Sequence, residues 1–371
     1  MNPSDWDREF AKYRSSPEFA LLNPNMTLTE FKKIYWMEWT HRLWGRLVGL
    51  TFVLPSIYFI ARRRVSARTA TALLGISTLI GFQGFLGWWM VKSGLRDDLF
   101  APGSHPRVSQ YRLAAHLGTA FACYSAMLLT GLSVLREARW LREPAAITHA
   151  LITNKLHHPS LRPFRRAVTA LALLVFTTVL SGALVAGLDA GLIYNEFPYM
   201  GNGLTPPKSE LLDPFYSRSP DGSDLVWRNA LENPSLVQLD HRVLATTTFS
   251  AVMALWAYAR YNPRVRNVLT RSASRAVGVV AGLAWMQVVL GISTLLYLVP
   301  TPLAATHQAG SLALLTGVLV LRSRLAAPAP LVRLVAERAK ASSAGSVAAR
   351  SVGMAKSHFS TVAKHNRVVR A

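Results

Sequence analysis

Seven long apolar stretches divide this sequence. Each has the ~20 residues that an α-helix needs to cross the ~30 Å hydrocarbon core of a membrane. Hydrophobic residues make up 51% of the 371 positions, which is too apolar for an ordinary soluble protein. We therefore predict an all-α polytopic membrane protein, with spans at approximately 42–61, 71–91, 113–135, 167–187, 239–259, 276–299 and 303–321.

Charged residues are unevenly divided between the two sides that these spans define. One side holds 26 basic against 3 acidic residues, and the other holds 12 against 16. The first side comprises 62–70, 136–166, 260–275 and 322–371, and the second comprises 1–41, 92–112, 188–240 and the turn near 301. Because Lys and Arg accumulate in cytoplasmic or matrix loops, the net charge of +22 reports topology. The charge lies in short loops and a Ser/Ala-rich tail, which argues against a nucleic-acid partner.

The two halves of the chain echo each other. Three motifs recur in the same order at offsets of 200, 191 and 204 residues, which predicts a tandem of parallel four-helix bundles. The motifs pair Thr40-His41-Arg42-Leu43 with Asp240-His241-Arg242-Val243, Ala114-Ala115-His116-Leu117-Gly118 with Ala305-Thr306-His307-Gln308-Ala309, and Gln83-Gly84-Phe85-Leu86-Gly87 with Gln287-Val288-Val289-Leu290-Gly291. The second unit has four spans and the first has three. We therefore expect an eighth span, equivalent to 167–187, to precede residue 1 in the complete protein.

These patterns predict five regions in the chain. The first and the last are an N-terminal segment outside the membrane and a basic, flexible tail that we expect to rest on anionic lipid. The regions are the N-terminal segment 1–40, a first bundle 41–135, a basic loop 136–166, a second bundle 167–325 with an external loop 188–238, and the tail 326–371.

Four histidines lie at or soon after the start of predicted helices, at the ends that face the acidic side. Ionisable residues are rare in membrane spans, and these recur at repeated positions. In each half the two histidine-bearing spans are separated by one helix, so His41 can face His116 and His241 can face His307 across a bundle. Two facing imidazoles can ligate one heme iron from opposite sides. The alternatives are histidines that only hydrogen-bond neighbouring helices, and copper or zinc sites, which lack a third ligand here.

Other ionisable residues are assigned by position. Glu38 stands three residues before His41, so both project from one helical face, and Glu38 can act as a base or stabilise developing positive charge. Its alternative role is an interfacial acid paired with Arg42 or Lys33. Cys123 lies inside an apolar span, where we expect it to pack in the core. The remaining histidines fall in loops or the tail, and we expect them to be solvated: His105, His149, His157, His158, His358 and His365.

The chain resembles the heme A synthase family in its mitochondrial and alphaproteobacterial form. The resemblance covers about residues 1 to 325. It rests on Glu38-Trp39-Thr40-His41-Arg42-Leu43-Trp44-Gly45-Arg46-Leu47-Val48-Gly49, His116, Gly187-Leu188-Asp189-Ala190-Gly191, Tyr194-Asn195, Phe197-Pro198, Asp240-His241-Arg242 and Thr306-His307-Gln308. Members of this family have eight spans. Glu196 and Tyr199 depart from the expected Thr and Leu, and the cysteine pair of the bacterial branch is not matched.

The resemblance implies an oxidoreductase that converts heme O to heme A for cytochrome c oxidase assembly, by two successive hydroxylations of the methyl group at ring carbon 8. By this resemblance, His41 and His116 belong to the substrate-heme site, Glu38 to its chemistry, and His241 and His307 to a resident heme b. The implied location is the mitochondrial inner membrane, with basic loops in the matrix and the histidines toward the intermembrane space. Implied partners are the lipid bilayer, an electron-transfer partner such as a ferredoxin, heme O synthase, oxidase assembly factors and a second copy of the chain.

Two other functions compete with this one. A diheme b-type electron-transfer protein needs both histidine couples but neither a substrate pocket nor Glu38. A transporter with parallel repeats needs broken helices or acidic residues at the membrane midplane, which this sequence lacks. Mutation of Glu38 separates the first alternative from a synthase.

Overall fold

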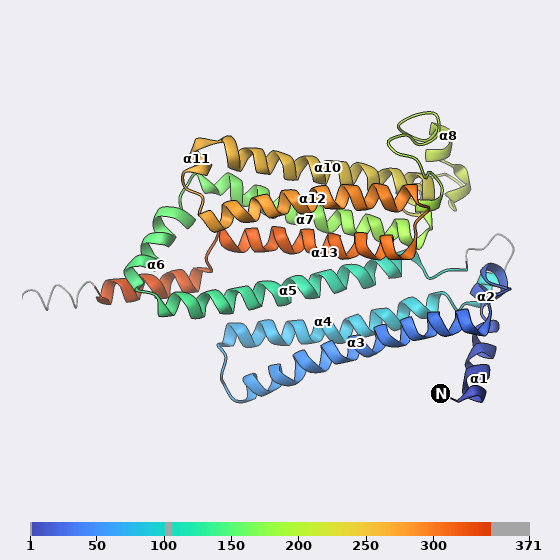
Figure 1. Ribbon diagram of the computed structural model, residues 1–371, viewed down its shortest axis with the longest axis horizontal. Helices are drawn as coiled ribbons and strands as arrows, with labels where there is room; N and C mark the ends of the chain where they lie inside the picture. The colour runs from blue at the N-terminus through green and yellow to red at the C-terminus, as the bar shows by residue number, and fades with distance from the viewer. Residues whose placement is uncertain (1, 101–105, 343–371) are drawn as a thin grey trace, which may run out of the picture. The chain divides into compact units, whose positions relative to one another are not determined.

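The computed structural model describes residues 2–100 and 106–342, and these residues are predominantly helical (Figure 1). Within the described ranges no β-strand forms, and the only extended pairing is an isolated bridge between Met200 and Gly203. The long helices are α3 (Leu28–Ala61), α4 (Ala67–Ser93), α5 (Gln110–Arg142), α7 (Leu161–Gly187), α10 (Pro234–Tyr261), α12 (Arg271–Leu296) and α13 (Thr301–Arg324). The predicted all-α class is therefore confirmed.

Six long helices of the described chain are long and apolar enough to cross a membrane: α3, α4, α5, α7, α12 and α13. The seventh predicted span falls in α10, which is a 28-residue helix but lies outside this set. Arg242 and Arg260 leave only 17 residues between them, so the apolar stretch of α10 is short. Seven crossings and the tandem repeat remain predictions.

The N-terminal segment 1–40 is helical over most of its length. It forms α1 (Pro3–Arg14), α2 (Pro17–Leu22) and the first turns of α3. Thr27 and Glu30 form a capping box, in which each side chain bonds the other residue's main-chain N–H, so α3 begins well before its apolar stretch. Trp6 of α1 packs edge-on against Tyr35 of α3, with ring centroids 5.1 Å apart.

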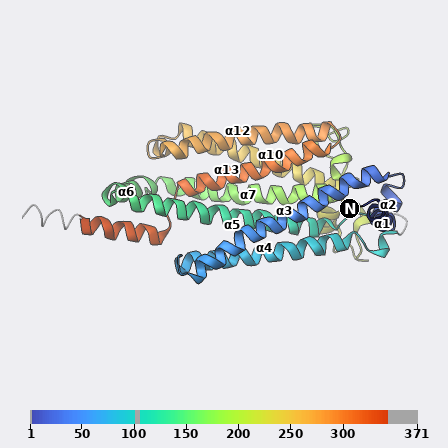
Figure 2. The ribbon, with the colours of Figure 1, turned by 60° about the horizontal axis from the view of Figure 1, so that its bottom comes forward.

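The chain divides into two compact units. The first comprises Met1–Thr130, Ala170–Ala254 and Val279–Leu319. Figures 1 and 2 both show α3 and α4 of this unit side by side, and the two helices are in contact. This unit contains every residue predicted to ligate heme or act on it.

The second unit comprises Gly131–Thr169, Leu255–Gly278 and Val320–Ala371. Its core includes Trp140, Ile152 and Leu156, packed against Leu331 and Val335. Leu331 and Val335 belong to a helical segment, 329–342, in the stretch that we predict from the sequence to be a flexible tail. The start of the tail is therefore ordered by burial of its apolar residues, and 343–371 lie outside the described residues.

The external loop 188–238 contains several short helices. These are η3 (Ala190–Leu192), α8 (Lys208–Leu211), η4 (Pro214–Tyr216) and α9 (Leu225–Glu232), and α10 begins at Pro234. Asn229 and Asn233 are buried in it, and the Asn233 Nδ2 donates to the Asn229 Oδ1 at 2.8 Å. A hydrogen-bonded polar core therefore holds this loop together.

Candidate functional site

The four span histidines project from four helices of the first unit. His41 lies on α3, His116 on α5, His241 on α10 and His307 on α13. His41 and His116 are close enough for their imidazoles to interact electrostatically, and so are His241 and His307. His41 is thus a neighbour of His116, and His241 is a neighbour of His307. The assignment of these couples as heme ligands stays a prediction. His41 is exposed, and the other three histidines are half-buried.

A glutamine and a glycine of α4 hold His116. The Gln83 Nε2 donates to the His116 main-chain carbonyl at 2.9 Å and lies 3.5 Å from its Nε2. One helical turn later, a Cβ on Gly87 would lie 3.0 Å from the His116 Cε1. Gly87 thus provides the space that the imidazole occupies, and Gln83 fixes the helix that carries it.

The same arrangement recurs around His307. In the amide orientation that satisfies its neighbours, Gln287 donates to the His307 carbonyl and to its Nδ1, each at 3.1 Å. A Cβ on Gly291 would lie 3.0 Å from the His307 Cε1. The glutamine-and-glycine motif found as a sequence echo thus contacts the second histidine of each couple.

His241 has an additional contact that the sequence did not reveal. It comes from Ser181 and Gly182 of α7. The Ser181 Oγ lies 2.8 Å from the His241 Nδ1, and a Cβ on Gly182 would lie 3.1 Å from the His241 Cε1. The contact forms because α7 packs beside α10 in the folded chain. The sequence gives no sign of it, because neither Ser181 nor Gly182 is near a histidine in the sequence.

Glu38 pairs with Arg42 of its own helix. The Arg42 Nη1 donates to the Glu38 Oε1 at 3.0 Å, and both side chains are about half exposed, at 49% and 48%. This is the contact of the simpler alternative raised for Glu38. An exposed pair of this kind contributes about 0–1 kcal/mol, so it leaves the carboxylate free to exchange partners.

The corresponding residues of the second half, Gln238 and Arg242, do something different. The Gln238 Nε2 donates to the Tyr194 carbonyl at 3.0 Å. Arg242 donates at 2.9–3.4 Å to four main-chain carbonyls, those of Tyr194, Glu196, Pro198 and Tyr199. Arg242 belongs to the motif on which the family resemblance rests, yet its role as the anchor of loop 194–199 was not predicted.

Tyr194 links this loop to the rest of the external segment. Its hydroxyl donates to the Glu210 Oε2 at 2.6 Å, and the Ser235 Oγ donates to the Glu210 Oε1 at the same distance. The bond to the Glu210 carboxylate and burial together raise the pKa of Tyr194 to about 12. Asn195 adds a second tie, because its Nδ2 donates to the Leu295 carbonyl of α12 at 3.1 Å.

The donor set around the couples suits a heme better than a bare metal ion. Within residues 2–100 and 106–342 there is no group of three or more His, Cys, Asp or Glu side chains that could hold an ion. A heme needs only two axial ligands, because its macrocycle supplies the other four. The His116 Nδ1 is buried without a hydrogen-bond partner, as expected for a ring whose surroundings are completed by a bound group. The residues present therefore fit bis-histidine heme.

The remaining predicted positions lie away from the couples. Cys123 is buried and forms no disulfide. His158 accepts a bond from the Ser160 main-chain nitrogen at 3.3 Å, which is a local turn contact. His105, His358 and His365 lie outside the described residues.

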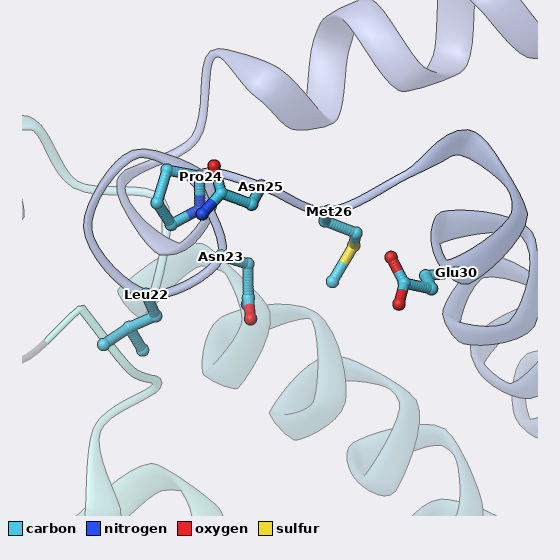
Figure 3. A pocket seen from close by; sticks show the side chains of 6 residues that line it. All are labelled: Leu22, Asn23, Pro24, Asn25, Met26 and Glu30. Carbon is cyan, nitrogen blue, oxygen red and sulfur yellow. The ribbon is translucent and has the colours of Figure 1, made fainter.

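Two hollows mark the first unit. The pocket in Figure 3 is lined by Leu22, Asn23, Pro24, Asn25, Met26 and Glu30, and contains none of the predicted site residues. A second, apolar hollow of about 430 Å³ borders α5 on both sides of His116 along the chain. Its lining is Leu79, Phe82, Ala114, Ala115, Gly118, Thr119, Ala122, Phe176 and Leu180.

The sequence matches known proteins over most of its length. The COX15-CtaA family, described as cytochrome oxidase assembly protein, matches residues 1–319. Heme A synthase COX15 of Saccharomyces cerevisiae is 48% identical over 336 residues, which cover 90% of this chain and 68% of the yeast protein. Heme A synthase COX15 of Homo sapiens is 48% identical over 323 residues, covering 86% and 71%. A heme A synthase-mitochondrial ferredoxin fusion protein of Schizosaccharomyces pombe is 48% identical over 327 residues, covering 88% of this chain and 53% of the fusion.

Proposed function

Because the chain belongs to the COX15-CtaA family of cytochrome oxidase assembly proteins, we propose that it is a heme A synthase, an oxidoreductase that acts on heme O. The reaction oxidises the methyl group at ring carbon 8 of heme O. Each of two successive hydroxylations takes an oxygen atom from water, releases two protons and passes two electrons to the electron-transfer partner. The hydrated aldehyde that results loses water, which leaves the formyl group of heme A. The product serves cytochrome c oxidase assembly.

One observation supports the assignment of roles: Glu38 stands one helical turn before His41, whereas Gln238 stands at the equivalent position before His241. His41 and His116 hold the substrate heme, and Glu38 acts on it. The Glu38–Arg42 pair is exposed and weak, so Glu38 can turn toward the substrate as a base or stabilise positive charge that develops there. In the second half the equivalent position is Gln238, which is committed to loop 194–199 and cannot take a proton.

The second couple, His241 and His307, holds a resident heme b, which supplies electron transfer when bound. Arg242 keeps loop 194–199 folded, and Asn195 ties that loop to the end of α12. The loop thereby covers this end of the helices and limits the access of water.

The apolar helices and the mitochondrial relatives favour a multi-pass protein of the mitochondrial inner membrane. The proposed topology has seven crossings in a tandem repeat of parallel bundles. The basic segments face the matrix, and the histidine couples lie toward the intermembrane space. The ferredoxin part of the Schizosaccharomyces pombe fusion favours a ferredoxin as the electron-transfer partner. Heme O synthase, oxidase assembly factors and a second copy of this chain are further proposed partners.

The direct test is expression in cells that make heme O but no heme A, followed by chromatography of the extracted hemes. The wild-type chain should give heme A, and His41→Ala should not. Glu38→Gln should keep both hemes and lose heme A formation. A Glu38→Gln variant that still makes heme A would remove Glu38 from the chemistry, and a wild-type chain that binds two hemes without making heme A would favour the electron carrier.

A further inference from the structure

The contact between Ser181 of α7 and His241 indicates which nitrogen of the His241 imidazole carries the proton. The Ser181 hydroxyl has a single proton, and we assign it to the bond with the Thr178 carbonyl, 2.8 Å away, because a carbonyl oxygen can only accept. Only its oxygen lone pairs remain to face the His241 Nδ1, also at 2.8 Å. A bond at that distance requires a hydrogen, so Nδ1 supplies it.

A neutral imidazole carries one ring proton, and its other nitrogen then has a free lone pair. With Nδ1 protonated against Ser181, the lone pair of His241 is on Nε2. Histidines that ligate metals characteristically donate their other ring N–H to an acceptor, which fixes the ring and makes the ligand more basic. Gly182 completes the contact, because a Cβ there would lie 3.1 Å from the ring.

We infer that Ser181 is a positioning residue that presents His241 to the iron of the resident heme b through Nε2 and tunes the reduction potential of that heme. The inference rests on the proposed function, since it requires a heme at the second couple. The Nδ1–H···O bond increases electron donation by the imidazole, which favours ferric over ferrous iron and lowers the potential.

A hydroxyl near Ser181 provides a matched control. The Thr178 Oγ1 lies 2.8 Å from the Thr248 Oγ1 and donates to the Leu174 carbonyl at 2.9 Å. Thr178→Val removes this hydroxyl while leaving the Thr178 main-chain carbonyl that accepts from Ser181. It disturbs the same helix without touching the bond to His241.

The experiment uses the purified full chain with its hemes, and measures the midpoint potential and the low-spin ferric EPR signal of heme b. Ser181→Thr keeps an oxygen acceptor and should match the wild type. Ser181→Cys, with a weak acceptor, should raise the potential part of the way, and Ser181→Ala should raise it furthest and shift the EPR signal. Thr178→Val should leave both properties unchanged.

The order of the series decides the inference. Equal potentials and EPR signals in the Thr, Cys and Ala variants would overturn it, and so would a Thr178→Val shift as large as that of Ser181→Ala. If Ser181→Ala loses its heme, equal potentials in the Thr and Cys variants still overturn it. A wild-type chain that binds no heme contradicts the proposed function and the inference with it, whereas bound heme with an unchanged series overturns the inference alone.

Discussion

Single glycines determine how closely the helices approach the histidines. Gly87, Gly182 and Gly291 each face a histidine Cε1 at a distance where a Cβ would sit at the limit of normal contact, 3.0–3.1 Å. Three of the four span histidines thus pack against a glycine of a neighbouring helix. A methyl group at any of these positions must displace an imidazole from the place where it can meet a heme.

Gly291→Ala should therefore lower the amount of heme b bound per chain. Overpacking of this kind costs ~1–3 kcal/mol, so we expect a loss of heme together with a less stable second couple. The ratio of heme to protein, measured after purification, checks this. Gly282→Ala on the same helix is the control, because a Cβ at Gly282 meets nothing within 4 Å. Equal heme loss in both variants would mean that an added methyl group harms α12 whether or not it meets His307, and would remove the explanation through His307.

At the scale of elements, loop 194–199 depends on one side chain of α10. Arg242→Lys keeps the positive charge but replaces a planar fork of five donors with a single ammonium group, which cannot reach four carbonyls. Hydrogen bonds to charged groups contribute ~1.5–3 kcal/mol each, so losing one or two should speed amide exchange in the loop by about tenfold or more. Hydrogen exchange with mass spectrometry measures this. Arg42→Lys, whose arginine joins only an exposed pair, should leave that loop unchanged.

The same loop should become sensitive to alkaline pH through Tyr194. Its pKa is raised to about 12, mainly by the hydrogen bond to the Glu210 carboxylate, against an unfolded value near 10. A raised pKa in the folded state contributes stability that is fully present below pH ~10 and is lost as the pH rises toward 12. Protection of the loop, which is the intrinsic base-catalysed exchange rate relative to the observed rate, should therefore fall between pH 10 and 12 in the wild type. In Tyr194→Phe, the loop should already be less protected from exchange at pH 8, and its protection should change less between pH 10 and 12. An identical pH profile in the two proteins would contradict this role of Tyr194.

Most of the helices were predictable from the sequence, because apolar length alone requires them in a membrane. Six of the seven predicted spans lie within a helix, and the span predicted at 276–299 extends three residues beyond the end of α12 at Leu296. The early start of α3 could have been predicted from Thr27 and Glu30, a capping pair. The helix 329–342 was not predicted, because the many basic residues of this segment indicate a flexible tail. The apolar pair Leu331 and Val335, one turn apart and buried in the structure, was the signal for a helix.

The candidate site was only partly predictable. The four histidines and the repeated glutamine-and-glycine motif are visible as echoes between the halves. The contact of Ser181 with His241 and the bonds from Arg242 to loop 194–199 are not visible in the sequence, because they join segments that meet only in the folded chain. Ser181, for example, is 60 residues from His241. Sequence periodicity gives the direction of a side chain along its own helix, and it cannot say which other helix arrives there.

At the scale of the whole molecule, the uneven charge predicts one orientation in the membrane. The segments with 26 basic residues should face the matrix, and loop 204–234 should face the intermembrane space. In mitochondria with a ruptured outer membrane, protease should cleave loop 204–234 and leave 136–166 intact until the inner membrane is dissolved. Cleavage of 136–166 before loop 204–234 would mean that the protein has the opposite orientation in the membrane.

The central claim is that two histidine couples hold two different hemes. It is tested most directly by extracting and separating the hemes from the purified chain and its ligand variants, made in cells that supply heme O. The wild type should yield heme b together with heme O or heme A, His41→Ala and His116→Ala should retain only heme b, and His241→Ala and His307→Ala should lose heme b selectively. If every variant lost both hemes in equal proportion, or if His41→Ala lost heme b instead, the assignment of the couples would be wrong.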